Sequence, residues 1–419
     1  METSPRSVEA ALPFRPHPVT LPEDGPLPLA AAQPHAFWSG FLSALKARKP
    51  VLLMDPTWPD KWGQALENCL KNKGHKNKGQ ALGSPRDGAV LPEGPSIVLA
   101  TSGSSGLPKL CLHDPATLGA AAAAFRDRFS ASGIIHAVVV LPQHHVGGLM
   151  PVLRAAASGG RVHFADYRNP RSLTAAPFPL RQASLSVVPT QLSRMRADPG
   201  FLALLRQFGL VLSGGAHAPA DLLAWARRES IRLAPCYGST ETAAMVTVLD
   251  PESFLSGITA VGTPMPHATI RLDARQRVLV ESPSNLRSYL PRQDGFSRTP
   301  FAMGDIGRID STGQLHILGR ADRVINCGGE KIHPELVEAA AIASGLVAAA
   351  YCHGVADPDW GMRAELKVVP RQEPAITRPR LLAHLREALP PYAVPKALHL
   401  VEAVPAAPKA DFTRADFSA

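Results

Sequence analysis

The sequence of 419 residues has few cysteines, and none is arranged for a metal site or a disulfide framework. The five cysteines are odd in number and widely spaced, and no C-x-x-C pair occurs. This pattern fits a reducing compartment. The sequence also lacks a run of about 18 apolar residues, and its first residues have no apolar stretch behind a basic start. We therefore expect a cytoplasmic protein without a signal peptide or a membrane span.

Clusters of like charge are also scarce. The chain has 44 Lys and Arg against 35 Asp and Glu residues, a net charge of +9, and the basic residues are mostly scattered. The one basic run covers residues 71–78 (KNKGHKNK) and contains no aromatic residue on which a base could stack. We interpret it as a solvated loop and expect no nucleic-acid partner. Charged residues make up 19% and hydrophobic residues 45% of the chain, a balance typical of a folded core.

The chain is too long for one compact core, so more than one folding unit is expected. After a proline-rich and alanine-rich beginning at residues 1–34, which we expect to be extended, short apolar strands alternate with helices as far as residue 245. This alternation predicts parallel α/β layers. Short strands between turns then predict a small barrel-like element, and a further α/β pattern begins at 322. We therefore predict a large domain over 35–321 and a small mobile α+β domain over 322–419.

The strongest chemical motif is the segment 101–109, which follows a short apolar strand. Its residues are Thr101, Ser102, Gly103, Ser104, Ser105, Gly106, Leu107, Pro108 and Lys109. Glycines let successive backbone N–H groups approach an anion, the hydroxyls add neutral donors, and the lysine adds a cation for a triphosphate. A flexible linker is the alternative, but a linker need not follow a buried strand or end in Pro-Lys.

This loop resembles the phosphate loop of the acyl-adenylate-forming superfamily, which includes acyl-CoA synthetases and aryl-CoA ligases. Further motifs follow in that family's order. The segment 213–216 is similar to the loop under the adenine, through Gly214, Gly215 and Ala216, and 237–242 (YGSTET) is similar to the Y-G-x-T-E motif. By this resemblance Tyr237, Gly238 and Ser239 lie at the adenine, Thr240 contacts the α-phosphate, and Glu241 holds Mg²⁺, which prefers oxygen ligands.

The resemblance continues toward the C-terminus and covers about 96–417. The segment 303–307 (MGDIG) is similar to the family's G-D-x-G motif, in which Asp305 would bind the ribose hydroxyls. The segment 319–335 matches the hinge region. There Arg320 would reach ribose or phosphate, Asp322 would be the hinge, and the pair Gly328 and Gly329 would line the path of the CoA thiol.

The resemblance implies that a carboxylate attacks ATP to form an acyl-AMP, and that coenzyme A then takes the acyl group. A C-terminal lysine usually assists the first step from a P-x-x-x-x-G-K-x-x-R stretch. Here the stretch is 405–414 (PAAPKADFTR), so Asp411 stands at the usual lysine position and Lys409 lies two residues earlier. Two interpretations remain open: Lys409 acts in an altered register, or adenylation is impaired.

The choice of acid is indicated by the segment 141–149 (LPQHHVGGL), which resembles the acyl-pocket motif of o-succinylbenzoate–CoA ligases. By this resemblance His145 and Ser186 line the acyl site, and Arg154 meets a second carboxylate. An arginine on the surface is the alternative for Arg154, and an ordinary polar residue at a strand end is the alternative for Ser186. The expected activity is that of an acid–thiol ligase of menaquinone or phylloquinone biosynthesis.

Three other functions stay open on the sequence. The chain could be a CoA ligase for another acid, an enzyme that loads a carrier protein, or a homologue that binds an adenylate without catalysis. The expected ligands are ATP, Mg²⁺, coenzyme A and a small carboxylic acid, and the expected assembly is a monomer or a homodimer.

Overall fold

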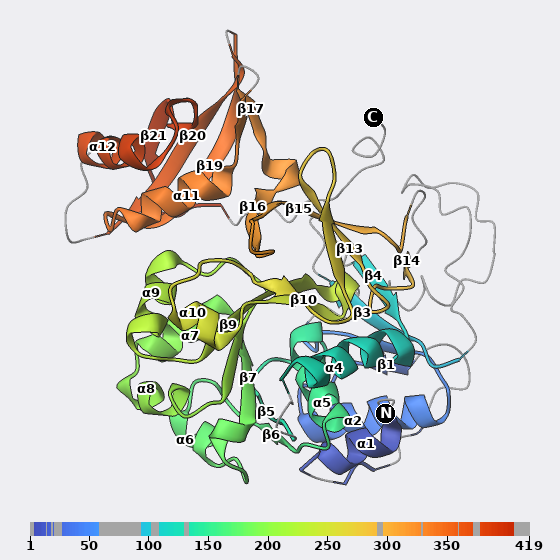
Figure 1. The fold of residues 1–419 in the computed structure, drawn as a ribbon. Helices are drawn as coiled ribbons and strands as arrows, with labels where there is room; N and C mark the ends of the chain where they lie inside the picture. The colour runs from blue at the N-terminus through green and yellow to red at the C-terminus, as the bar shows by residue number, and fades with distance from the viewer. Residues whose placement is uncertain are drawn as a thin grey trace. The chain divides into compact units, whose positions relative to one another are not determined.

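The computed structural model describes residues 4–13, 15–17, 20, 27–57, 94–101, 109–129, 134–290, 296–327, 330–358, 360–371 and 378–405 (Figure 1). Its contacts divide the chain into two compact units. The first consists of residues 1–218, 226–270 and 280–301, and the second consists of 219–225, 271–279 and 302–419. The mixed α/β architecture with a large and a small unit confirms the predicted fold class.

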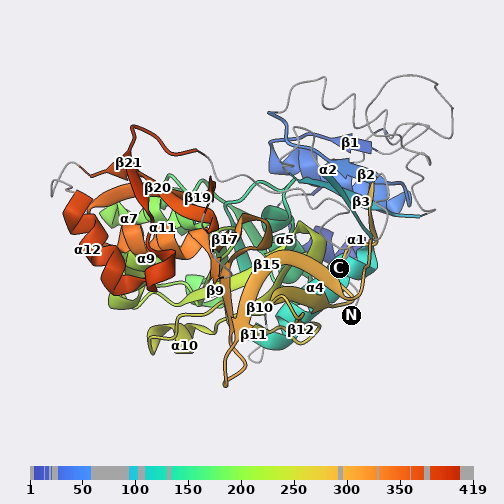
Figure 2. The same ribbon diagram turned by 90° about the horizontal axis from the view of Figure 1, so that it is seen from above.

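A five-stranded sheet in the first unit carries the two strands that flank the phosphate loop. Its order is β1-β2-β3-β4-β14, with bounds Leu27–Leu29, Val51–Leu53, Ile97–Thr101, Lys109–His113 and Ser288–Leu290. The strands β1, β2 and β3 are parallel, whereas β4 runs antiparallel to both β3 and β14. Helix α2 (Pro34–Lys46) lies beside β1 and β2 of this sheet (Figure 2).

A seven-stranded sheet forms the centre of the first unit. Its order is β11-β10-β9-β8-β7-β5-β6, with bounds Thr263–Pro264, Ala244–Val248, Leu233–Ser239, Leu210–Ser213, Ala183–Val187, His136–Val139 and Val162–Phe164. The strands β9, β8, β7, β5 and β6 are parallel, as the alternation of strands and helices predicts. Ligands commonly bind beyond the carboxyl ends of such strands.

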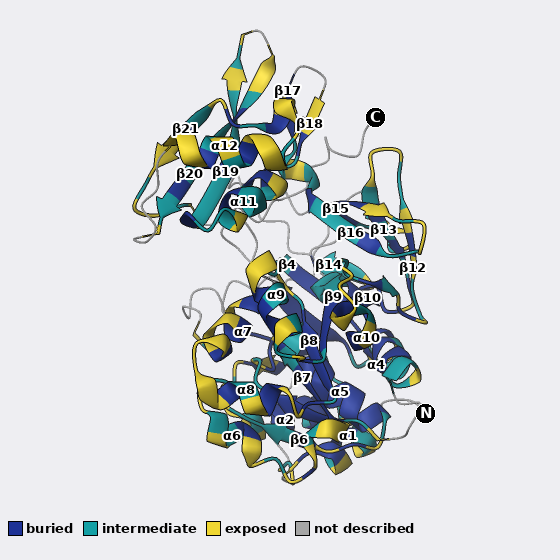
Figure 3. Cartoon of the chain, turned by 60° about the vertical axis from the view of Figure 1, so that its left-hand side comes forward, coloured by how far each residue is buried: buried dark blue, intermediate teal, exposed yellow. Residues whose placement is uncertain are grey.

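Helices pack against this sheet and connect its strands. They are α4 (Pro115–Phe129), α5 (Val146–Ala157), α6 (Pro170–Thr174), α7 (Pro189–Arg196), α8 (Pro199–Leu205), α9 (Ala220–Arg228) and α10 (Pro251–Leu255). Many begin at a proline, which suits the first helical position because its missing N–H has no partner there. Helix α5 is buried along most of its length, as are β7 and β8 (Figure 3).

The second unit holds most of a four-stranded sheet and the whole of a five-stranded sheet. The four-stranded sheet has the order β12-β13-β15-β16, with bounds Thr269–Leu272, Arg277–Glu281, Phe301–Ile309 and Leu315–Arg320. The other has the order β18-β17-β20-β19 with β21 beside β20, and the bounds are Glu330–Ile332, Ile325–Cys327, Gly361–Pro370, Val347–Asp357 and Ala397–Leu400. Helices α11 (Pro334–Ala343) and α12 (Arg378–Ala388) bury apolar residues in a core with this sheet.

The structure differs from the expected extended lead-in at α1 (Pro5–Ala11). Ser4 caps this helix by accepting a hydrogen bond from the Ser7 backbone N–H, and Val8 and Ala11 are buried in the main core. A cap and two apolar residues on one face suffice for a short helix once tertiary packing supports it. Within the described residues no helix combines the length and the apolarity of a membrane span. The basic run 71–78 lies outside the described residues.

Candidate functional site

The two ends of the predicted phosphate loop are held side by side by β3 and β4. Thr101 at the end of β3 is the register partner of Lys109 at the start of β4. The loop therefore leaves and re-enters one antiparallel pair, and its residues 102–108 lie outside the described residues. Lys109 is half-buried at the position where β4 begins.

The segment 237–242 lies at the end of β9, and a short 3₁₀ turn, Thr240–Thr242, follows it. His113, the last residue of β4, bonds the Thr240 carbonyl through Nε2 at 2.8 Å. The Leu286 N–H donates to the Glu241 carbonyl at 2.7 Å, and the Ser284 hydroxyl donates to the Thr242 carbonyl at 3.0 Å. The strand that follows the phosphate loop is thus tied directly to the turn that carries Glu241.

Burial keeps the His113 ring, which bonds the Thr240 carbonyl, neutral. The His113 ring is fully buried, and desolvation lowers its pKa to about 4 although the bond to the Thr240 carbonyl acts in the opposite direction. The imidazole is therefore uncharged at neutral pH.

The turn ends in Ala243 and Ala244, which have positive φ angles of 53° and 78°. Such angles are uncommon for residues with a side chain and point to a backbone held by its surroundings.

Tyr289 orients the Glu241 carboxylate. Its hydroxyl donates a hydrogen bond of 3.0 Å to Glu241 Oε1. Tyr289 is the register partner of Cys111 on β4. Burial, followed by the charge of Glu241, raises the pKa of the Tyr289 phenol well above its usual value, so the phenol stays a donor. A carboxylate held in this way offers oxygen to a hard cation, so the residues present fit the Mg²⁺ ion that the sequence motif implies.

The glycines of the adenine motifs are required by close approach. A Cβ atom on Gly238 would lie 1.8 Å from the Ala244 carbonyl oxygen, and one on Gly214 would lie 2.7 Å from the Cys236 Sγ. Gly215 has a φ of +80°, which residues with a side chain rarely adopt. The Oγ of Ser213, which ends β8, is buried and has no hydrogen-bond partner among the described residues.

The acyl-pocket motif lies between β5 and α5. His145 is the N-cap residue of α5, and His144 is buried beside it. A Cβ atom on Gly148 would lie 2.1 Å from the Pro142 carbonyl oxygen, so the first turn of α5 can pack on 141–142 only with glycine at this position. This contact fixes where both histidines lie relative to the helix.

Arg154, in the last turn of α5, is buried rather than on the surface, and only 4% of it is exposed. Its guanidinium lies 4.8 Å from the centre of the Phe125 ring. Within the part of the chain that the structure describes, no ion pair with a carboxylate is found for it, and its Nε has no hydrogen-bond partner. Burial lowers the pKa of Arg154 to about 10, so it remains charged at neutral pH. A buried charge without a partner is costly, so an anion beside Arg154 would offset the cost if the described residues are its whole surroundings.

Two further groups lie near this guanidinium. His267 has both ring nitrogens buried without a partner among the described residues. Burial and then the Arg154 charge lower its pKa to about 4. Burial raises the pKa of the Cys236 thiol to about 11. On β7 the Oγ of Ser186 is also buried and unbonded among the described residues. His267 and Cys236 are therefore both neutral near the charged Arg154.

The second unit brings together the residues predicted at the ribose. Asp305 on β15 and Arg320 at the end of β16 are register partners, with 3.5 Å between Asp305 Oδ1 and Arg320 Nη1. Arg320 Nε also lies 3.4 Å from Asp322 Oδ1. Asp305 stands within a strand and not in a turn. Gly328, Gly329 and Lys409 lie outside the described residues.

Sequence reasoning did not select several residues that shape this site, namely Asp55, His113, Tyr289 and His267. His113 and Tyr289 act through bonds to residues more than 40 positions away in the sequence, so no local spacing could reveal them. Asp55 Oδ2 lies 3.7 Å from His144 Nε2, and these two residues are also far apart in the sequence. The pair of adjacent histidines was the one visible sign that His144 could matter.

Comparison with known proteins agrees with these motifs. Residues 40–289 match the model of the AMP-binding enzyme family, and 336–410 match that of the AMP-binding enzyme C-terminal domain. The 2-succinylbenzoate–CoA ligase of Bacillus licheniformis is 28% identical over 74% of this chain and 67% of its own length. The indoleacetate–CoA ligase of Aromatoleum aromaticum is 27% identical over 77% of this chain and 66% of its own length.

Solved structures show the same fold. The unliganded o-succinylbenzoate coenzyme A synthetase from Bacillus subtilis has a TM-score of 0.74 at 17% identity, over 96% of this chain and 92% of its own. An amide bond synthetase from Marinactinospora thermotolerans has a TM-score of 0.73 at 22% identity, over 91% and 86%. The match to the Bacillus subtilis complex with the acyl-adenylate intermediate covers 66% of that chain. This chain thus spans about two thirds of the length of several relatives.

Proposed function

The chain belongs to the AMP-binding enzyme family, and we propose that it is an AMP-forming acid–CoA ligase whose acid is o-succinylbenzoate. The observation that carries the choice of acid is the buried guanidinium of Arg154 without a carboxylate partner among the described residues. An acid with one carboxylate needs no such cation beyond the reacting group, whereas o-succinylbenzoate has a second carboxylate on its ring. The relatives named 2-succinylbenzoate–CoA ligase support the same choice.

In the first step we propose that the acid carboxylate attacks the α-phosphate of ATP, releasing pyrophosphate and forming an acyl-AMP. The Thr240 hydroxyl would contact the α-phosphate, and the Glu241 carboxylate, oriented by Tyr289, would hold Mg²⁺. Bound Mg²⁺ supplies neutralisation of phosphate charge. Lys109 and the backbone of 101–106 would bind the phosphates, and Tyr237 would lie against the adenine. Catalysis of this kind depends mainly on positioning and on electrostatic stabilisation.

The chain's remaining predicted residues would serve the ribose and the thiol. We propose that Asp305 accepts hydrogen bonds from the ribose hydroxyls and that Arg320, 3.5 Å away, orients that carboxylate and adds positive charge. Asp322 as the hinge, the glycines at 328 and 329 as the thiol path, and Lys409 as the adenylation lysine stay predictions. We also retain the proposals of a cytoplasmic enzyme and of a monomer or homodimer.

The experiment is ATP–pyrophosphate exchange with a panel of acids, followed by thioester formation with free CoA. We expect exchange with o-succinylbenzoate at a kcat/KM at least about tenfold above benzoate and fatty acids, because one charge-assisted contact contributes more than about 1.4 kcal/mol. Glu241→Gln should need more Mg²⁺ for half-maximal exchange, and the matched surface variant Glu229→Gln should not. Absence of exchange with every acid would refute the enzyme, and equal exchange with all acids would refute the substrate.

A further inference from the structure

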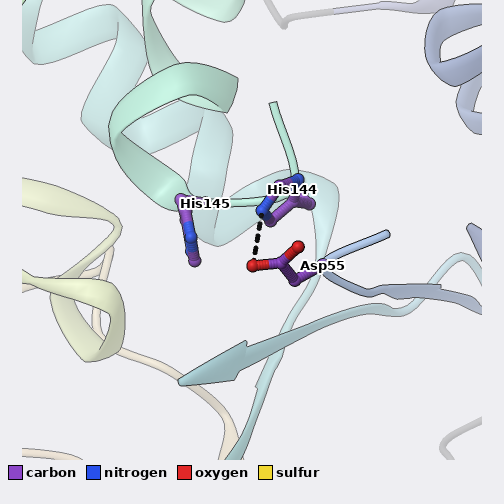
Figure 4. A group of neighbouring side chains, drawn as sticks. All are labelled: Asp55, His144 and His145. Atoms are coloured by element: carbon purple, nitrogen blue, oxygen red, sulfur yellow. Dashed lines mark ion pairs between the residues drawn. The ribbon is translucent and has the colours of Figure 1, made fainter. Parts of the chain in front are cut away.

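A group of three metal-ligating side chains lies between β2 and α5. Asp55 follows β2, and His144 and His145 precede α5, so the ligands come from segments about 90 residues apart. One ligand atom from each of the three lies within 4.8 Å of the others. Figure 4 shows the His144 ring and the Asp55 carboxylate facing each other, with the His145 ring beside them. The same three residues line a cavity of about 540 Å³.

The His144 side chain provides an independent sign of a ligand. His144 is 8% exposed, and its Nε2 is buried without a hydrogen-bond partner among the described residues. Asp55 Oδ2 lies 3.7 Å from this nitrogen, which is beyond hydrogen-bonding distance. An unsatisfied buried polar atom costs about 1–3 kcal/mol, so an occupant between the two groups would relieve that cost.

The separations suit a small cation bound to nitrogen and oxygen. Metal–ligand bonds of about 2.1 Å in a tetrahedral arrangement separate the ligand atoms by roughly 3.4 Å. The 3.7 Å between His144 Nε2 and Asp55 Oδ2 is close to this edge. The ligand atom of His145 lies within 4.8 Å of the other two, so a side-chain movement of up to about 1.4 Å would bring it to the same spacing.

The donor set distinguishes between classes of metal. Two imidazoles and one carboxylate suit zinc, cobalt or nickel, whereas Mg²⁺ and Ca²⁺ prefer oxygen ligands alone. We propose that Asp55, His144 and His145 form a binding site for a divalent transition-metal ion, with its remaining coordination positions open to the cavity. This metal is separate from the Mg²⁺ assigned to Glu241.

Metal binding at His145 would affect the proposed reaction, and this consequence rests on the proposed function. His145 is the residue proposed to line the acyl site, and a metal-bound imidazole is no longer available to the acid. The ion therefore acts as a reversible inhibitor that competes with the acid rather than with ATP.

The binding test uses the full chain, stripped with a chelator, and measures Zn²⁺ by calorimetry and Co²⁺ by its visible absorption. We expect one Zn²⁺ per chain, tighter binding of Ni²⁺ than of Co²⁺ and of Co²⁺ than of Mn²⁺, and a Co²⁺ spectrum typical of nitrogen and oxygen ligands. Asp55→Asn, which removes the negative charge of one ligand, and His144→Phe, which removes one ligand, should each weaken Zn²⁺ binding by at least about tenfold.

The control variant is His35→Gln. His35 lies near another histidine, His17, with 5.0 Å between the ring centres, but these two belong to no three-ligand group among the described residues. His35→Gln should bind Zn²⁺ as the unaltered chain does. The site is refuted if the unaltered chain takes up no Zn²⁺, if Asp55→Asn and His144→Phe bind it equally well, or if His35→Gln removes the binding.

Zn²⁺ inhibition of ATP–pyrophosphate exchange, relieved by the acid and by chelation, tests the consequence separately. Zn²⁺ binding that depends on Asp55 and His144 in a chain without exchange activity would support the site and refute the proposed enzyme. Exchange activity in a chain that binds no Zn²⁺ would support the proposed enzyme and refute the metal site. Inhibition that persists in His144→Phe would refute the link between this site and His145.

Discussion

Replacement of Arg154 by methionine should make the protein more stable and, at the same time, less able to use its acid. Arg154 is 4% exposed, and its guanidinium has no carboxylate partner within the described residues. Burial lowers its pKa from 12.5 to about 10, which corresponds to roughly 3 kcal/mol against the charged form. Because the pKa is lowered in the folded chain, this penalty is fully present at neutral pH, where arginine is charged in both states.

Methionine has a similar length and carries no charge, so the variant removes this penalty. We expect the free energy of unfolding of the first unit to rise by about 1–3 kcal/mol, less than the whole penalty because the contact with the Phe125 ring is lost. In exchange assays the same variant should lose about 1.5–3 kcal/mol with o-succinylbenzoate, or roughly 10- to 150-fold in kcat/KM. With benzoate the loss should be much smaller.

The matched control is Arg206→Met, because Arg206 forms an exposed ion pair of 2.6 Å with Glu229. We expect a change in stability of below about 1 kcal/mol and no change in the choice of acid. Denaturant unfolding and the two exchange assays measure all three effects. If Arg154→Met is less stable and loses exchange equally with both acids, the guanidinium serves the packing of α5, and the inference of an anion site is wrong.

Two further predictions concern the supports of the site. Gly148→Ala should destabilise the protein by about 1–3 kcal/mol in denaturant unfolding, because its Cβ would lie 2.1 Å from the Pro142 carbonyl oxygen. Gly147→Ala, whose Cβ would meet only the end of a leucine side chain at 3.2 Å, should have little effect, and equal effects would refute the packing argument. Burial lowers the pKa of His113 from 6.5 to about 4, so stability should fall as the pH drops from about 6.5 to about 4, because the unfolded chain binds more protons there. His113→Gln, which removes the titrating ring, should reduce this slope, and an unchanged slope in pH-dependent melts would refute it.

Much of the fold follows from the pattern of apolar strands and helices. The continuous apolar runs at 137–141 and 183–188 became β5 and β7, which are buried on both faces and parallel, as such runs predict. The strand β15 was missed, because its central residues, 303–307, include two glycines and an aspartate, which are depleted in strands. Its strand character comes from pairing with β16, which no local pattern states.

Some residues of the site could be predicted from the sequence, and others could not. Tyr237, Thr240 and Glu241 could be selected because their chemistry is contained in six consecutive residues. Burial of Arg154 could not be predicted from the sequence. Helix α5 is apolar on nearly all sides, so its sequence shows no alternation between an apolar and a polar face. On such a helix a charged residue has no polar face to occupy, and only the tertiary structure decides whether it reaches solvent.

If His145 and Arg154 hold the acid as proposed, α5 is the element that sets the choice of acid. It runs from Val146 to Ala157, and its residues from 148 to 157 are buried. His145 at its start and Arg154 in its last turn are nine residues apart, which at 1.5 Å per residue is about 13 Å along the axis. A packed helix holds such groups more rigidly than a loop does. In the proposed function the phosphate loop and the turn at Glu241 would serve activation of any acid, whereas α5 would discriminate between acids. Substitutions within α5 should therefore alter the choice of acid, whereas substitutions on α6 and α8 should not.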